Sequence, residues 1–331
     1  MKLQVPAWSG DGGVRMKQDV KIAVIGLGGV GGYIGAALAD TYENVSFAAR
    51  GLRKESLEEK GLILHSDCLG ERTAYPMRVV ESVRELPVQD FIFVCVKNYS
   101  LEEVCDDIRD AAGGDTVIIP VMNGADPGTK ARRHIGRGTV LDALIYIVSY
   151  ADEAYEVIQK GEYAHIHIGL GNPDGQEQAV LNEAAELMRN AGLDCRIDED
   201  IQKAIWKKYS LNCAFNVMTA YYSTDTEGIR NHPERLADFK AILYEAREVA
   251  GAKGIDLPET FLDRQLDHFI NVQEPDATSS LRRDMDAGRR CELETFSGYL
   301  VSEAGRLGIA VPVSKRYYEG LKEKQIRLGG R

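Results

Sequence analysis

A glycine-rich turn near the start of the chain carries the pattern G-x-G-x-x-G. A short apolar run rich in β-branched residues, 20–25, precedes the turn, and a helical pattern at 30–42 follows it. In such a strand-turn-helix unit the first glycine makes the turn, the second lets the backbone approach a pyrophosphate, and the third lets the helix pack closely on the strand. The helix N-terminus also offers N–H groups and a positive dipole end to phosphates. The segment therefore predicts a dinucleotide site, with an ordinary tight turn as the alternative. Its residues are Gly26, Leu27, Gly28, Gly29, Val30 and Gly31.

The next predicted strand, 44–50, ends on a cation. Proteins that bind NAD usually place an acid here for the ribose 2′-hydroxyl, whereas this chain has Arg50. A carboxylate would repel a 2′-phosphate, but a guanidinium can pair with it through two parallel hydrogen bonds. The sequence therefore predicts NADP(H) rather than NAD(H) as the cofactor. Arg53 and Lys54 follow closely, and each is interpreted by itself as a solvated loop cation.

A second segment places three polar side chains on one face of a predicted helix. Lys208, Asn212 and Asn216 stand at i, i+4 and i+8, which aligns an ammonium and two amides along one stripe. Asparagine is unfavourable inside helices, so two of them aligned with a lysine require a reason. The spacing alone leaves open a solvated face, or amides that bond a neighbouring backbone.

The elements that must position these groups change in kind along the chain. Over the first part, apolar strands alternate with helical patterns: a strand at 90–97, a helix at 101–112 and a strand at 116–122. This alternation predicts an α/β domain with a parallel, doubly wound sheet of the Rossmann type. Residues 139–170 predict longer strands of an antiparallel extension, and a helix is expected at 176–191.

After Asp198 the strand signal almost stops, and the remaining patterns have helical spacing bounded by Gly or Pro. The chain of 331 residues also exceeds the size at which one core usually suffices. We therefore predict a dinucleotide-binding domain over 20–198 and an all-helical domain over 199–331. Residues 1–19 show no core-forming period and are expected to form a loose extension. The predicted helices of the second domain are 199–219, 233–252, 258–270, 293–307 and 314–324.

Composition limits the possible partners. A net charge of −11 and a pI near 5.2 disfavour binding to nucleic acid or to an anionic membrane. The apolar runs are too short to span a bilayer, the N-terminus has no signal-peptide core, and the six scattered cysteines fit reduced thiols. These features predict a soluble, cytoplasmic protein.

Two other groups of ionisable residues are interpreted as structural. The acidic pairs Glu102-Glu103 and Asp106-Asp107 fall on a predicted helix and are taken as its solvated face. A pair of histidines two residues apart in a predicted strand, 165 and 167, could share one face, but no third ligand of suitable type follows, so no metal site is expected.

Six short motifs in a fixed order give the chain a family resemblance. Besides the glycine turn they are Val96-Lys97, Asn123-Gly124, Trp206-Lys207-Lys208 with its two asparagines, Ser279-Ser280 leading to Glu292, and 308–312. On these residues, which span nearly the whole chain after residue 20, the chain resembles the ketopantoate reductases (2-dehydropantoate 2-reductases). The resemblance implies a Rossmann-type domain followed by an all-helical domain, as in 6-phosphogluconate dehydrogenase-like proteins. It also implies that NADPH reduces the C2 ketone of 2-dehydropantoate to (R)-pantoate, a step of pantothenate and coenzyme A biosynthesis.

The same resemblance implies two catalytic roles. Lys208 would be the general acid that protonates the ketone oxygen as hydride arrives, and burial in a closing cleft would improve it as a donor by lowering its pKa. Glu292 would hold a substrate hydroxyl and orient the lysine. The alternative for Glu292 is a surface acid among Arg289, Arg290 and Glu294.

The remaining implied contacts involve the cofactor and the substrate's polar groups. Asn123 would lie by the nicotinamide and the reacting carbonyl, although the dipeptide Asn123-Gly124 by itself is equally a loop turn. Lys97 would reach toward the 2′-phosphate or adenosine end of the cofactor, alongside Arg50. The implied substrate-binding residues are Asn123, Asn212, Asn216 and Ser280.

Some positions depart from the family pattern and leave alternatives open. Cys291 stands where threonine is common before the glutamate, and Leu293-Glu294-Thr295 replaces the more usual isoleucine with an acid or asparagine. Ala125 replaces a larger apolar residue. These changes leave open the alternative that the chain is a divergent family member, which reduces another small 2-oxo acid or ketone. A catalytically weak NADP(H)-binding sensor is a second alternative, and a hydroxyacid dehydrogenase of the 6-phosphogluconate type, which ordinarily has a Lys-x-x-Asn pair, is a third. Apolar helix faces in the second domain also make a homodimer possible.

Overall fold

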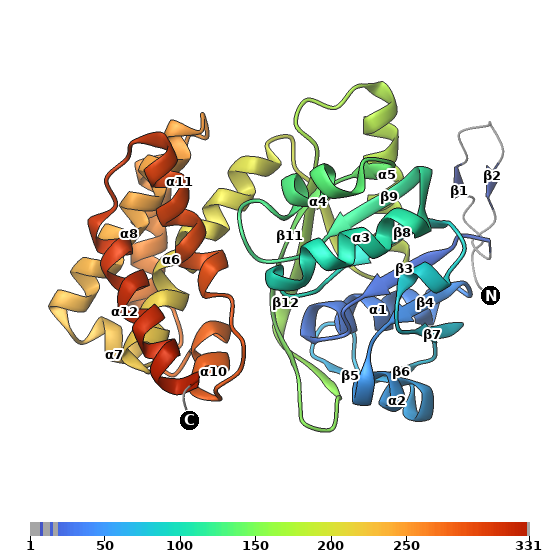
Figure 1. The fold of residues 1–331 in the computed structure, drawn as a ribbon, viewed down its shortest axis with the longest axis horizontal. Helices are drawn as coiled ribbons and strands as arrows, with labels where there is room; N and C mark the ends of the chain where they lie inside the picture. The colour runs from blue at the N-terminus through green and yellow to red at the C-terminus, as the bar shows by residue number, and fades with distance from the viewer. Residues whose placement is uncertain (1–6, 9–13, 16–18, 330–331) are drawn as a thin grey trace. The chain divides into compact units, whose positions relative to one another are not determined.

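The computed structural model describes residues 7–8, 14–15 and 19–329, and the chain divides into two compact units, Met1–Ile201 and Gln202–Arg331 (Figure 1). The boundary between the units along the chain therefore lies a few residues beyond Asp198, where the sequence pattern changes. Ahead of the first unit's main sheet, β1 (Ala7–Trp8) pairs antiparallel with β2 (Val14–Arg15). Most of the predicted loose extension over 1–19 lies outside the described residues.

The first unit is built on a parallel sheet in the order β10-β9-β8-β3-β4-β7, as predicted for a doubly wound fold. From β3 the chain proceeds to β4 and β7 on one side and then to β8, β9 and β10 on the other. Ligands of such sheets bind beyond the carboxyl ends of the strands where this direction reverses, which here are β3 and β8. The strands are β3 (Ile22–Ile25), β4 (Val45–Ala48), β7 (Arg78–Val80), β8 (Gln89–Val94), β9 (Ala112–Pro120) and β10 (Thr139–Val140).

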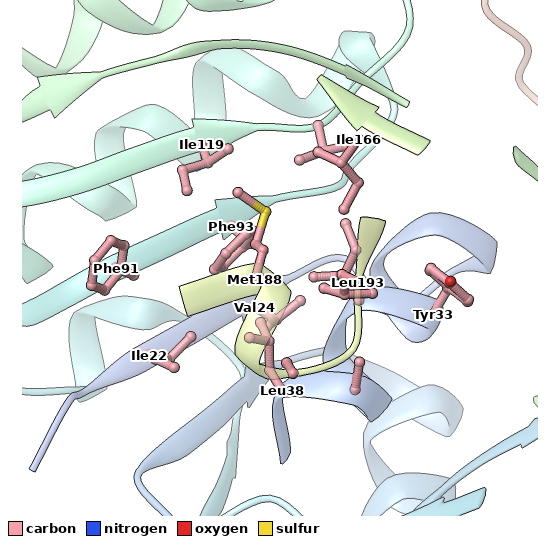
Figure 2. Packing of buried hydrophobic residues seen from close by; sticks show 14 of the residues in the cluster. Ile22, Val24, Tyr33, Leu38, Phe91, Phe93, Ile119, Ile166, Met188 and Leu193 are labelled. Carbon is pink, nitrogen blue, oxygen red and sulfur yellow. The ribbon is translucent and has the colours of Figure 1, made fainter. Parts of the chain in front are cut away.

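Helices cover both faces of this sheet. The helical segments of the unit are α1 (Gly29–Thr41), α2 (Gly51–Lys60), η1 (Val83–Glu85), η2 (Asn98–Ser100), α3 (Leu101–Ala111), α4 (Pro127–Ile135) and α5 (Gly175–Asn190). Val24 and Phe93 point into one core with Met188 of α5, as Figure 2 shows. Their neighbours Ala23 and Ile92 belong to a second core with α3 and α4. Burial on both faces explains why these strands read as continuous apolar runs.

A second, mixed sheet lies in the same unit. The predicted antiparallel extension is confirmed by the long pair β11 (Asp142–Ala151) and β12 (Val157–Gly169). β12 also pairs in parallel with β5 (Leu62–Ser66) and β13 (Asp194–Ile197), and β5 pairs antiparallel with β6 (Arg72–Ala74).

Helix α1 packs directly, through glycines, on the hairpin formed by β11 and β12. A Cβ atom at Gly29 would lie 2.6 Å from the Ser149 backbone, and one at Gly32 would overlap the Val157 side chain. Because only glycine permits this approach, the helix that begins at the glycine turn is fixed against β11 and β12.

The second unit is helical throughout the part that the structure describes. Its segments are α6 (Ile201–Tyr222), α7 (Thr226–Arg230), α8 (Pro233–Ala252), α9 (Glu259–Asn271), α10 (Ser280–Asp286), the π-helical turn η3 (Glu294–Gly298), α11 (Tyr299–Leu307) and α12 (Pro312–Gly329). The fully buried Trp206 makes an edge contact with Tyr209 at 5.3 Å between ring centroids. Tyr209 makes a similar contact with Tyr299 at 5.8 Å, so aromatic rings join α6 to α11.

Two further features bear on the sequence-based expectations. Within residues 19–329 no helix is long and apolar enough to cross a bilayer. All six cysteines are among the described residues, and none of them forms a disulfide.

Candidate functional site

The glycine turn between β3 and α1 has the geometry of a phosphate cradle. Gly26 has φ +86°, and a Cβ there would lie 2.8 Å from the Cys95 carbonyl oxygen. A Cβ at Gly31 would overlap the Gly26 carbonyl. By contrast, Gly28 faces open space with no atom within 4 Å of its Cβ position. Gly28 is also the N-cap of α1, and no side chain caps this helix end, so its N–H groups can receive a pyrophosphate.

Arg50 lies at the N-cap of α2, just beyond the carboxyl end of β4. Its Nη1 donates to Glu103 at 2.7 Å, its Nη2 lies 3.5 Å from Asp107, and its Nε donates to the Glu81 carbonyl at 3.3 Å. The hydrogen bond with Glu103 raises the pKa of Arg50 above its usual value. The prediction of a solvated face is confirmed for Glu103, whose side chain is 64% exposed and binds this guanidinium, but it is wrong for Asp107, whose side chain is only 15% exposed. A phosphate at Arg50 would compete with Glu103.

Arg53 is not a solvated loop cation. It lies within helix α2 and is half-buried, its Nε donates to the Leu27 carbonyl at 3.0 Å, and its Nη1 donates to the Tyr155 carbonyl. Burial lowers the pKa of Arg53, which Tyr155 and Asp152 partly oppose. Sequence reasoning missed these contacts because both acceptors are backbone oxygens, which no residue pattern reveals. Lys54, the next cation, lies 3.6 Å from Glu81 and 3.8 Å from Glu58.

Lys97 and Asn123 follow the adjacent parallel strands β8 and β9. Lys97 is the N-cap of η2, and Gly124 after Asn123 has φ +106°, which favours glycine. The Asn98 side chain donates from Nδ2 to the Asn123 carbonyl at 2.7 Å. Asn98, which the sequence analysis did not single out, therefore joins the two loops at the carboxyl edge of the sheet.

In the second unit, α6 carries the predicted polar stripe. Asn216 Nδ2 donates to Asn212 Oδ1 at 3.4 Å, and Ser280 Oγ at the start of α10 donates to Asn216 Oδ1 at 3.5 Å. Ser279 is the N-cap of α10 and accepts a 2.7 Å hydrogen bond from Thr219, so α10 is anchored on α6. The structure thus brings together two amides and a hydroxyl that could bind carboxylate or hydroxyl groups.

Lys208 and Glu292 belong to the same unit and are electrostatically coupled. Burial lowers the pKa of Lys208 to about 8, and the negative charge of Glu292 opposes this change. Glu292 is only 4% exposed, so the alternative of a surface acid is wrong. Its neighbour Glu294 instead accepts hydrogen bonds from the Tyr318 hydroxyl at 2.8 and 2.9 Å. An ammonium with a pKa near neutrality is suited to proton donation.

The segment that follows Glu292 is tied to α6 by contacts that the sequence did not suggest. The Tyr209 hydroxyl donates to the carbonyls of Thr295 at 3.0 Å and Phe296 at 3.3 Å. The Cys213 thiol also donates to the Phe296 carbonyl at 3.0 Å. These bonds satisfy carbonyls of the π-helical turn and hold the Glu292 segment against the helix of Lys208.

The histidines of β12 bind different acids. His165 Nδ1 lies 2.6 Å from Asp194, and His167 Nδ1 lies 2.7 Å from Asp198. Each imidazole therefore has its own carboxylate partner on or after β13.

Comparisons with known proteins cover both units. Residues 22–173 match the family described as Ketopantoate reductase PanE/ApbA, and residues 200–325 match Ketopantoate reductase PanE/ApbA C terminal. A 2-dehydropantoate 2-reductase of Mesorhizobium japonicum is 28% identical over 312 residues, which is 87% of this chain and 92% of the relative.

Solved structures extend this similarity to the fold. The crystal structure of 2-dehydropantoate 2-reductase from Methylococcus capsulatus has a TM-score of 0.82 at 28% identity and covers 93% of this chain and 98% of its own. A ternary structure of D-mandelate dehydrogenase with NADH and anilino(oxo)acetate has a TM-score of 0.84 at 20% identity, covering 93% of this chain and 99% of its own. At that identity the second likeness concerns the fold alone.

Proposed function

Because the chain belongs to the ketopantoate reductase family, we propose that this oxidoreductase uses NADPH to reduce the C2 ketone of ketopantoate. The product would be (R)-pantoate, for pantothenate and coenzyme A biosynthesis. The observation that carries the proposal is the pKa of Lys208, lowered to about 8 on a helix that also carries Asn212 and Asn216. An unperturbed lysine near 10.5 would give up its proton far less readily.

Lys208 protonates the ketone oxygen in this mechanism. When bound, a reduced nicotinamide supplies the hydride that reaches C2. The ketone oxygen then gains negative charge, and the ammonium first stabilises it electrostatically and then transfers a proton to it. Glu292 keeps Lys208 charged in the resting enzyme, because its carboxylate favours the ammonium form.

The substrate's polar groups are assigned to the stripe on α6 and the start of α10. Asn212, Asn216 and Ser280 form one hydrogen-bonded series, with links of 3.4 and 3.5 Å. These long links are weak, so a substrate carboxylate or hydroxyl can replace them at low cost. Neutral donors also suit an anion that has to leave as product. Glu292 accepts a hydrogen bond from the substrate hydroxyl.

The cofactor is a nicotinamide dinucleotide held by the glycine turn. Gly28 leaves room for the pyrophosphate, and the uncapped α1 N-terminus provides its donors. We assign the 2′-phosphate of NADP(H) to Arg50 with Lys97, and the nicotinamide end to Asn123. The Arg50 side chain supports NADP(H) because it is 58% exposed and can replace its hydrogen bond with Glu103 by one with a phosphate.

A divergent family member is the second candidate. Two of the departures from the family pattern, Cys291 and Ala125, are buried, since each is 7% exposed. Buried substitutions change the shape of a site more than its charge, so they favour a different small 2-oxo acid over a different reaction.

The test is the initial rate of NADPH oxidation with ketopantoate and a panel of other 2-oxo acids. A clear preference for ketopantoate supports the pantothenate assignment, and preference for another acid supports the divergent member. Lys208→Ala is expected to lower kcat by roughly 10²-fold or more. Lys207→Ala is the matched control, because Lys207 is adjacent but packs on the Phe261 ring at 5.4 Å. Binding of NADPH without turnover of any 2-oxo acid would favour a sensor protein instead.

A further inference from the structure

One guanidinium in the first unit joins three segments that are distant in sequence. Arg53 donates from Nε to the carbonyl of Leu27, 26 residues away, and from Nη1 to the carbonyl of Tyr155, 102 residues away. Leu27 lies between Gly26 and Gly28 in the glycine turn. Tyr155 lies in the turn between β11 and β12. Arg53 therefore connects α2, the glycine turn and the end of the hairpin.

The hairpin turn is itself rigid. Asp152 accepts hydrogen bonds from the backbone N–H groups of Ala154 at 2.9 Å and Glu156 at 2.8 Å. Tyr155 has φ +65°, which is unusual for a residue with a side chain, and its ring lies 5.8 Å from the Arg53 guanidinium carbon. The turn thus presents its carbonyl in a fixed position.

The glycine turn is attached to the same hairpin on its other side. Gly29 at the start of α1 packs on the Ser149 backbone, and Gly32 packs on Val157. Arg53 adds a third attachment, directly on the Leu27 carbonyl. With Leu27 held in this way, the peptide units that flank it have little freedom to rotate.

Packing alone does not account for an arginine here. The Nη2 group of Arg53 is buried and has no hydrogen-bond partner among the described residues. A buried cationic donor left unbonded costs free energy, so a residue selected only for stability would be apolar or fully bonded. What an arginine adds is a cation fixed 3.0 Å from the backbone of the glycine turn. A pyrophosphate bound at that turn would gain from this charge.

We propose that Arg53 is a positioning residue for the cofactor, which fixes the glycine turn and supplies positive charge beside the pyrophosphate. This inference rests on the proposed function, because it requires a dinucleotide at the turn. The proposal assigns the two arginines to different parts of the cofactor. Arg53 serves the pyrophosphate, which NADPH and NADH share, and Arg50 serves the 2′-phosphate, which only NADPH has.

The test measures dissociation constants of the full chain for four ligands: NADPH, NADH, ADP-ribose and adenosine 2′,5′-bisphosphate. The last of these has the 2′-phosphate but no pyrophosphate. Arg53→Met is expected to weaken the binding of NADPH, NADH and ADP-ribose by a similar factor of about tenfold and to leave the affinity for the bisphosphate nearly unchanged. Arg50→Met is expected to give the opposite pattern, with NADPH and the bisphosphate weakened and NADH retained.

Two further variants separate positioning from folding. Arg53→Lys keeps the charge but lacks the planar guanidinium that donates to both carbonyls from fixed directions, so its affinity for ADP-ribose should fall between wild type and Arg53→Met. Leu52→Ala changes an exposed neighbour of Arg53 on α2 that has no part in these contacts, so it should bind ADP-ribose like wild type.

The outcomes distinguish the inference from the proposed function. If wild type binds NADPH and Arg53→Met binds each of the four ligands as tightly as wild type does, the inference is overturned and the proposed function stands. If Arg53→Met loses the bisphosphate as fully as ADP-ribose, Arg53 supports the fold in general and the inference is also overturned. If wild type binds neither NADPH nor ADP-ribose, the proposed function is wrong and the inference fails with it.

Discussion

If Lys208 is the proton donor, as proposed, it should set an alkaline limit on catalysis. With a pKa of about 8, this ammonium is about nine-tenths protonated at pH 7 and about one-tenth protonated at pH 9. If Lys208 donates the proton, the rate of ketone reduction should fall roughly tenfold over this interval. A lysine with its ordinary pKa of 10.5 would produce almost no fall over the same range.

Glu292→Gln tests the electrostatic part of this reasoning. The Glu292 carboxylate raises the pKa of Lys208, so its replacement by a neutral amide should lower that pKa further. The alkaline limb of the rate profile should therefore move to lower pH. Because Glu292 is also assigned to the substrate, KM is expected to rise in the same variant, and only the midpoint of the limb reports the charge effect.

The assay is the pH dependence of kcat/KM for the 2-oxo acid at saturating NADPH from about pH 6 to pH 10, which reports ionisations of the enzyme before this substrate binds and is not masked by product release. Lys207→Ala should retain the wild-type profile. A wild-type rate that stays level until about pH 10, or an unchanged midpoint in Glu292→Gln, would refute the assignment of the limb to Lys208.

The remaining predictions concern the cofactor half of the site. Arg50→Asp should raise KM for NADPH and change KM for NADH little. Glu103→Gln should instead tighten the binding of NADPH by up to about fivefold, which is the range expected when an exposed ion pair is released. Equal effects on both cofactors in steady-state kinetics would count against this site. Gly28→Ala should keep the thermal midpoint, because φ −81° suits alanine and the Cβ has space, yet raise KM for NADPH and NADH alike by about tenfold; unchanged KM values would place the pyrophosphate elsewhere. Gly31→Ala should instead destabilise the fold by about 1 to 3 kcal/mol in chemical denaturation, because its Cβ would overlap the Gly26 carbonyl, and a wild-type midpoint would contradict this overlap.

The sequence predicted the long, periodic elements and missed short ones. Helix α8 lies at 233–252 as expected, because buried residues recur at helical spacing from Phe239 to Ala250. Helix α2 was missed, since Leu57 is its only buried residue and it offers no apolar stripe. Strands β6 and β7 have three residues each, which is too short for an alternating pattern to be recognised.

The candidate site was predictable where its signal is local. The spacing of Lys208, Asn212 and Asn216 required only that the segment be helical, and all three lie on α6. The pairing of Arg50 with Glu103 could not be foreseen in this way. It joins residues 53 positions apart, and it depends on how α2 and α3 follow β4 and β8, the two strands that flank β3 in the sheet. Tertiary contacts of this kind have no periodic signature.

The character of Lys208 results from two opposing influences. Burial disfavours the charged ammonium and, if unopposed, would lower the pKa of Lys208 further and reduce its protonated fraction near neutral pH. Glu292 favours the charged form, and the balance leaves a donor that is both protonated and ready to release its proton. In the proposed mechanism this balance needs the charge of Glu292 but not the neighbouring side chain, so Cys291 is expected to influence which ketone fits and not how it is reduced. The reaction type and the identity of the substrate are thus assigned to different residues, and the pH profile tests the first while the panel of 2-oxo acids tests the second.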